Sequence, residues 1–149
     1  MTTRLLAVGL VLLGMAEHSM GQGEAAAIRA KTTVHGDGTR TETITNVDEK
    51  TMRATTYDAS GKVLLKVLNR LNDDLEPVQA FYYDPAGKPL YRSVYKRDFN
   101  GRVTEVTDFS TTGKTLRRLV YSYDSVGKVM GIKAYDGNGN EIPSQRRKP

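Results

Sequence analysis

Residues 121–142 read YSYDSVGKVMGIKAYDGNGNEI and contain one short pattern twice. The first copy, YDSVGK, begins at Tyr123, and the second, YDGNGN, begins at Tyr135. Each copy has an aromatic residue, an aspartate, two variable residues and a glycine. An aspartate three residues before a glycine is typical of a tight reversal, because the carboxylate caps the turn and glycine tolerates a positive φ. The stretch therefore predicts strands joined by short turns.

The pattern recurs along the chain as a repeat of 26 residues that contains two turns. Self-similarity at a fixed period of this length indicates a repeat architecture. One series of turns keeps its register throughout, whereas the other is looser and lacks its glycine at Leu75. The first series comprises Tyr57, Asp58, Gly61, Tyr83, Asp84, Gly87, Phe109, Ser110, Gly113, Tyr135, Asp136 and Gly139, and the second includes Gly101, Tyr123, Asp124 and Gly127.

The segments between turns are about eight to ten residues long and rich in Val, Leu, Thr and Tyr. This length and composition predict β-strands, and a tight turn at each end predicts antiparallel hairpins. About nine to ten such strands is close to the size at which an open twisted sheet begins to curl. We therefore expect an all-β fold, an antiparallel β-hairpin meander built from 26-residue double-hairpin repeats and shaped as a curled sheet or a barrel.

Pairing the aspartate of each turn with the basic residue four positions later predicts a register. In that register Val94 faces Val106, Arg92 faces Asp108, Val120 faces Ile132 and Leu68 faces Met52. One face then carries Leu64, Leu90 and Leu116, and the other carries Tyr91, Tyr95 and Tyr121. Lys66, Arg92 and Arg118, which recur 26 residues apart, fall on the leucine face, where they either pair with acids or bind an acidic partner.

The first 21 residues have the pattern of a secretory signal peptide. Arg4 is followed by an apolar run over residues 5–16, which is shorter than the ~20 residues that cross a bilayer and matches a signal core. Ser19 and Gly21 are small residues before an expected cut ahead of Gln22; a buried N-terminal helix is the alternative. We expect a signal peptide at 1–21, a lead-in at 22–31, the β-hairpin repeat domain at 32–143 and a basic disordered tail at 144–149.

The sequence contains no cysteine, which excludes disulfides and thiol chemistry. His18 lies in the expected signal, so His35 alone is too little for a zinc site or a Ser-His-Asp arrangement. Asp136, Asn138 and Asn140 match the first half of an EF-hand loop, but Glu141 stands where that loop needs glycine. Much of the net charge of +5 lies in the tail. We therefore expect no enzyme, no cofactor, no metal and no nucleic-acid partner.

The Tyr-Asp-x-x-Gly-Lys motif, preceded by another aromatic residue in Phe81-Tyr82-Tyr83 and Tyr121-Ser122-Tyr123, resembles the YD/RHS repeat of bacterial secreted and surface proteins. The resemblance covers roughly residues 55–142. In that family the repeats form long β-sheets that wrap into shells or surface fibres, and enzymatic activity sits in separate terminal domains. The resemblance implies a non-catalytic β scaffold, although the alternating spacing of the turns and the few copies depart from the family. A weaker resemblance is to MORN-variant repeats, whose Gly-x-Trp element is absent.

These observations lead us to expect an exported, non-catalytic β-repeat module with a structural or protein-interaction role. Its expected location is secreted, periplasmic or at the cell surface, with no membrane span after signal cleavage. Because both sheet faces are partly apolar, we expect a protein partner or self-association. The alternative function is carbohydrate binding at the cell surface, with Tyr91, Tyr95 and Tyr121 as a platform for sugar rings; the same tyrosines could instead form a packing ladder.

Overall fold

The structure is a computed structural model that describes residues 27–143. The expected signal peptide, residues 22–26 of the lead-in and the tail at 144–149 lie outside the described residues. The described chain forms β1 (Ile28–Val34), β2 (Arg40–Asn46), β3 (Thr51–Tyr57), β4 (Val63–Leu71), β5 (Pro77–Tyr83), β6 (Pro89–Arg97), β7 (Val103–Ser110), β8 (Thr115–Tyr123), β9 (Val129–Asp136) and β10 (Glu141–Ile142).

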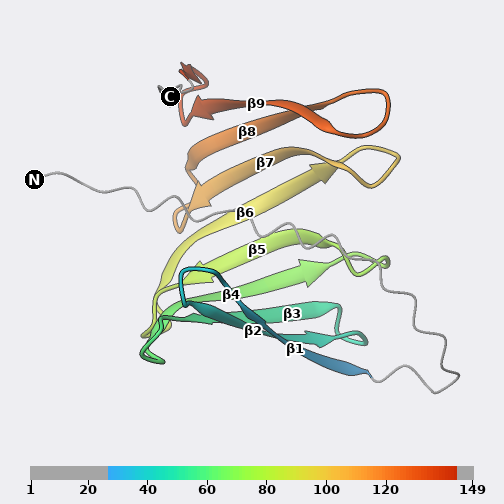
Figure 1. Cartoon of the computed structure of the whole chain (residues 1–149). Coiled ribbons are helices and arrows are strands. Elements are labelled where there is room, and N and C mark those ends of the chain that lie inside the picture. The colour runs from blue at the N-terminus through green and yellow to red at the C-terminus, as the bar shows by residue number, and fades with distance from the viewer. Residues whose placement is uncertain (1–26, 144–149) are drawn as a thin grey trace, which may run out of the picture.

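All ten strands belong to one sheet, in which spatial order follows chain order and neighbours are antiparallel. Figure 1 shows the strongly twisted sheet that results from this succession of hairpins, the right-handed twist being intrinsic to strands of L-residues. β1 and β10 are the two edges and do not pair with each other, so the sheet is open and not a closed barrel. The predicted all-β hairpin meander is confirmed.

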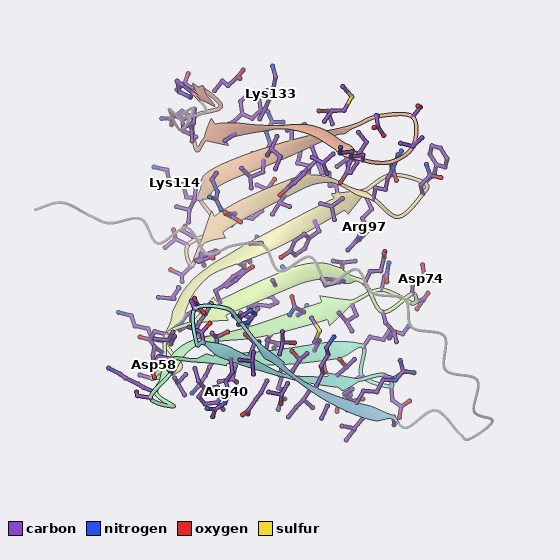
Figure 2. The ribbon with its side chains drawn as sticks, in the orientation of Figure 1. Arg40, Asp58, Asp74, Arg97, Lys114 and Lys133 are labelled. Carbon is purple, nitrogen blue, oxygen red and sulfur yellow. The ribbon has the colours of Figure 1, made fainter. Side chains whose placement is uncertain are left out.

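Alternate turns lie at opposite ends of this sheet. In Figure 2, Asp58 and Lys114 lie at one end, which we call the first end, and Asp74 and Arg97 lie toward the other, the second end. The turns of the regular series, which begin after Tyr57, Tyr83, Phe109 and Tyr135, all lie at the first end. Turns at the same end are two strands apart, or about 9.6 Å at ~4.8 Å per strand.

Each regular turn is closed by an aspartate side chain and a glycine. Asp58 Oδ1 accepts the backbone N–H groups of Ser60 and Lys62, each at 2.9 Å. The N–H of Gly61 donates to the carbonyl of Asp58 at 3.0 Å, and Gly61 has a φ of 88°. This is a left-handed conformation that costs glycine little. The same side-chain bond, from the N–H four residues on, recurs at Asp84, Asp98, Asp124 and Asp136, and with a serine hydroxyl at Ser110.

The turn that lacks its glycine keeps the same geometry. Leu75 has a φ of 60°, and Asn72 Oδ1 accepts the N–H groups of Asp74 and Glu76 at 3.1 and 2.8 Å. A non-glycine residue in this conformation is strained by ~1–2 kcal/mol. The asparagine cap and the half-buried Leu75 side chain therefore hold a turn that the backbone alone disfavours.

The predicted register is wrong by one residue. Val106 faces Tyr95 and not Val94, Asp108 faces Ser93 and not Arg92, Ile132 faces Tyr121 and not Val120, and Leu68 faces Arg53 and not Met52. The cause is a register shift just after each of six turns, where one residue of the outgoing strand has no partner. These unpaired bulge residues are Leu64, Val78, Leu90, Thr104, Leu116 and Met130.

Because a one-residue shift moves side chains to the opposite face, part of each predicted face is wrong. Val106 and Ile132 lie on the side of Tyr95 and Tyr121 and not opposite them, whereas Tyr91, Tyr95 and Tyr121 share one side as predicted. Direct partners share a face, so the pairings divide the strands into two sides. One side, the core face, carries every buried side chain of the described residues: Asn69, Leu71, Ala80, Ser93, Val103, Val106, Asp108 and Tyr121. The other, the arginine face, carries Arg40, Lys66, Arg92 and Arg118.

We predict that Gly87→Ala lowers the free energy of unfolding by about 1 kcal/mol, because a side chain is strained at positive φ. A Cβ at Gly87, whose φ is 87°, would meet no atom within 4 Å, so the effect isolates the backbone. Chemical unfolding followed by circular dichroism measures it. Gly36→Ala is the control, since Gly36 is equally open but not left-handed; equal losses in both variants would contradict this explanation.

Candidate functional site

The three predicted platform tyrosines lie together on the core face, but they are not equally open. Tyr91 stacks on Tyr82 with ring centroids 4.3 Å apart, and the hydroxyl groups of Tyr82 and Tyr95 are 3.4 Å apart. Tyr121 is only 8% exposed and packs with Val103 and Val106. Burial raises the pKa values of all three predicted tyrosines, which keeps their hydroxyls protonated. Tyr82, which the sequence analysis did not include, is therefore a better member of this row than Tyr121.

The buried carboxylate beside these tyrosines is fully engaged. Asp108 Oδ1 accepts the Ser93 hydroxyl at 2.6 Å, and Asp108 Oδ2 accepts Nη2 and Nε of Arg117 at 2.7 and 3.0 Å. A two-pronged guanidinium contact of this kind fixes both partners in the sheet. Arg117, not the predicted Arg92, is thus the cation that neutralises Asp108.

The repeated basic residues lie on the arginine face and cover aromatic rings of the first-end turns. The guanidinium carbon lies 4.4 Å from the ring centroid for Arg40 over Tyr57, 4.4 Å for Arg92 over Phe109 and 4.5 Å for Arg118 over Tyr135. Each cation is the direct cross-strand partner of its ring. Stacking of a guanidinium on an aromatic face stabilises the pair by ~0.5–1 kcal/mol at such exposed sites. Lys66, Arg92 and Arg118 share one face, as predicted, but Arg92 and Arg118 lie over turn aromatics.

Tyr83 is the exception in this series. Its cross-strand partner is Lys66, and no cationic group of the described residues lies over the Tyr83 ring. The difference follows from the side chains, since a planar guanidinium stacks on a ring whereas an ammonium is a strongly hydrated point charge. Two hollows of about 250 Å³ each adjoin Tyr83, one toward β6 and one toward β3.

At the second end, Arg97 and Tyr123 occupy the same position in successive repeats. The Tyr123 hydroxyl donates to the carbonyl of Val103 at 2.6 Å, and Arg97 Nη2 donates to the carbonyl of Pro77 at 3.2 Å. Each bond reaches back to the first residue of an earlier strand, β7 or β5. Arg97 therefore replaces the repeat tyrosine with the same hydrogen bond, and its Nε also lies 3.3 Å from Glu76 Oε2.

A row of exposed apolar side chains marks the first end. Leu64, Leu90, Leu116 and Ile142 are successively one repeat apart and are 44%, 45%, 46% and 43% exposed. Three of them are the bulge residues of their strands. We call these four residues the apolar ridge. Successive ridge residues are two strands apart, or about 9.6 Å, so they recur at a fixed spacing along this end.

The calcium-like sequence at Asp136 is a turn in the structure. Asp136 Oδ1 accepts the N–H groups of Asn138 and Asn140, each at 2.9 Å. Across residues 27–143, no group of three or more His, Asp or Glu side chains is arranged to hold a metal ion. His35 Nε2 lies 3.0 Å from the hydroxyl of Thr41. The same described range contains no helix of the length and apolarity that crossing a membrane requires.

Comparisons with known proteins give no family for the chain. No protein-family model matches it, and no curated protein matches it. Among solved structures, a porin-like protein from Bacteroides uniformis is similar, with 18% identity and a TM-score of 0.35; the match covers 76% of this chain and 47% of that protein. This chain therefore spans about half the length of that neighbour, and a likeness at this level carries no argument about function.

The turn aspartates predict a pH-dependent stability. Hydrogen bonds from the side chains of Ser60, Arg102 and Asn140 hold the pKa values of Asp58, Asp98 and Asp136, respectively, below the ordinary value for aspartate. A carboxyl whose folded pKa is lowered contributes stability above its unfolded pKa of ~3.9, and this contribution is lost as the pH falls through the folded value. We predict a lower unfolding midpoint at about pH 3 than at about pH 6.

Urea unfolding at the two pH values measures this loss. The triple variant Asp58→Asn/Asp98→Asn/Asp136→Asn keeps an oxygen acceptor in each turn but removes the titration, so its midpoint depends less on pH. A pH dependence unchanged from the natural protein would show that these turns are not its source.

Proposed function

We propose that the chain is an exported, non-catalytic β-repeat module with a structural or protein-interaction role, acting in the periplasm, at the cell surface or outside the cell. Export rests on the signal-like residues 1–21. The observation that carries the interaction role is the apolar ridge, because exposed apolar side chains that recur at a fixed spacing favour contact with another protein surface. The buried carboxylate of Asp108 is bound to Ser93 and Arg117.

Self-association through the ridge is the simplest form of this role. The four ridge side chains form a line across the first end, and a second copy turned by a two-fold axis would present the same line to it. The ridge is flanked by polar turn residues such as Asp84 and Lys88, both exposed or half-buried. An apolar centre with a polar rim is the usual composition of a protein interface.

We predict that the purified protein is a dimer or larger assembly at about 100 μM, and that Leu116→Glu/Ile142→Glu converts it to a monomer by placing like charges in the interface. Size-exclusion chromatography with light scattering measures the mass. The control is Phe99→Glu/Val126→Glu, because these side chains are 96% and 86% exposed at second-end turns, away from the ridge. A monomeric natural protein, or equal dissociation by both variants, would contradict association through the ridge.

Carbohydrate binding by the tyrosine row is the second candidate, favoured by the stacked pair Tyr82 and Tyr91, which lines one of the hollows beside Tyr83. We predict that cell-wall fragments or polysaccharides change the tyrosine fluorescence of the protein if this row is the site, because sugar rings pack on aromatic faces. Tyr91→Ala should abolish the change while Tyr135→Ala, on the opposite face, preserves it. No change with any glycan would contradict this candidate.

A further inference from the structure

We propose that the ring of Tyr83, over which no cation lies, and the basic residues around it bind an extended acidic segment of a partner protein, one that presents Asp or Glu and apolar or aromatic residues on the same side of the chain. This inference rests on the proposed interaction role but uses the arginine face and not the apolar ridge. The two proposals can therefore fail separately.

The first observation is a single exchange within the repeat. Arginine occupies the position opposite the turn aromatic in three repeats, at Arg40, Arg92 and Arg118, and its guanidinium covers the ring each time. Lys66 occupies that position opposite Tyr83 and leaves the ring uncovered. The position therefore keeps its positive charge in every repeat, but only here, among the described residues, does no cation lie over the ring of the turn aromatic.

The second observation is the shape of the surface beside Tyr83. The hollow toward β3 is lined by Arg53, Thr55, Lys66 and Leu68 together with Tyr83. The hollow toward β6 lies at the first end, where Phe81, Pro89 and Arg92 meet Tyr82 and Tyr91 of the core face. Each has a volume of about 250 Å³, just below the range of small-molecule pockets. Rings and aliphatic stems form much of both linings. Each hollow is suited to one apolar or aromatic side chain of a bound segment.

The third observation is the charge of the arginine face around these hollows. Among the described residues, Arg53, Lys66, Arg70 and Arg92 have no ion-pair partner. The other basic residues of this face are paired with its three acids: Arg40 with Glu42, Lys96 and Arg118 with Glu105, and Lys133 with Glu141. Three of these unpaired cations, Arg53, Lys66 and Arg92, line the hollows beside Tyr83, and Arg70 lies over Phe81. A partner that matches this surface carries carboxylates.

The combination of apolar hollows and cations favours a protein segment over other polyanions. A polyuronate or a nucleic acid offers negative charge but no apolar side chains to fill the hollows. In an extended peptide, side chains two residues apart point to the same side at a spacing of ~6.8 Å. A carboxylate and an apolar group placed two residues apart can therefore reach the cations and the hollows of the same face. Binding would then depend on the open ring as well as on charge.

The probe is a fluorescein-labelled peptide of about twelve residues, composed of glutamate with a phenylalanine at every third position. Fluorescence anisotropy measures its binding to the full protein. Lys66→Arg is the decisive variant, because it keeps the charge and, as at Arg92, places a guanidinium over the ring and fills the hollow toward β3, which residue 66 lines. We expect it to weaken binding about tenfold or more, while thermal unfolding shows an intact fold.

The matched control is Arg118→Lys, the reverse exchange two repeats further along the chain, which should leave the peptide affinity unchanged. Peptides with serine for phenylalanine or glutamine for glutamate should bind about tenfold more weakly. Equal binding to the natural protein and Lys66→Arg would overturn the proposal, as would absence of binding to the natural protein. Tighter binding of polygalacturonate or a single-stranded oligonucleotide would also overturn it. Leu116→Glu/Ile142→Glu separates the two proposals, because it should lose self-association but keep the peptide.

Discussion

The capped turn is the constraint on which the rest of the molecule depends. An aspartate carboxylate accepts two backbone N–H groups from the residues that follow it, and a glycine at positive φ completes the reversal, as at Asp58 and Gly61. Because this turn recurs at short and regular intervals in the sequence, it limits the length of each strand. It also joins each strand to its immediate neighbour in the sheet. A meander of short hairpins follows, with a thin core on one face and a charged layer on the other.

The turn chemistry made the fold class predictable, whereas the register was not. Aspartate, glycine and the aromatic residue are visible in the sequence because each is required by local geometry. The bulge residues carry no such mark: Leu64 and Leu90 look like ordinary strand residues, yet each is skipped in the pairing. One unrecognised residue per hairpin moved Val106 and Ile132 to the face of the tyrosines and placed Arg92 opposite Phe109. The predicted register therefore placed Arg92 opposite Asp108, whereas in the structure Arg92 lies over the ring of Phe109. Arg40 lies 26 residues before Lys66 and belongs to the same series of basic residues, although the sequence analysis did not include it.

The same repeat that builds the sheet also multiplies surface features. Three repeat units supply both a leucine of the apolar ridge and a basic residue two positions later: Leu64 and Lys66, Leu90 and Arg92, and Leu116 and Arg118. The repeated side chains of the apolar ridge favour contact with a second copy of the chain. A position where one repeat differs from the others favours a ligand that binds at a single site. Lys66 beside Tyr83 is such a position, and it connects the interaction role to a specific place on the sheet.

These functional proposals all depend on which residues share a face, so the most direct measurement is the nuclear Overhauser contact map of the protein in solution. The account predicts contacts between the Arg92 side chain and the Phe109 ring, and between the Tyr95 ring and the Val106 methyl groups. Contacts between Val94 and Val106, with Arg92 near Asp108 and away from Phe109, would contradict it. In that case Arg92 would lie beside Asp108, and neither the ring covering nor the exception at Tyr83 would stand.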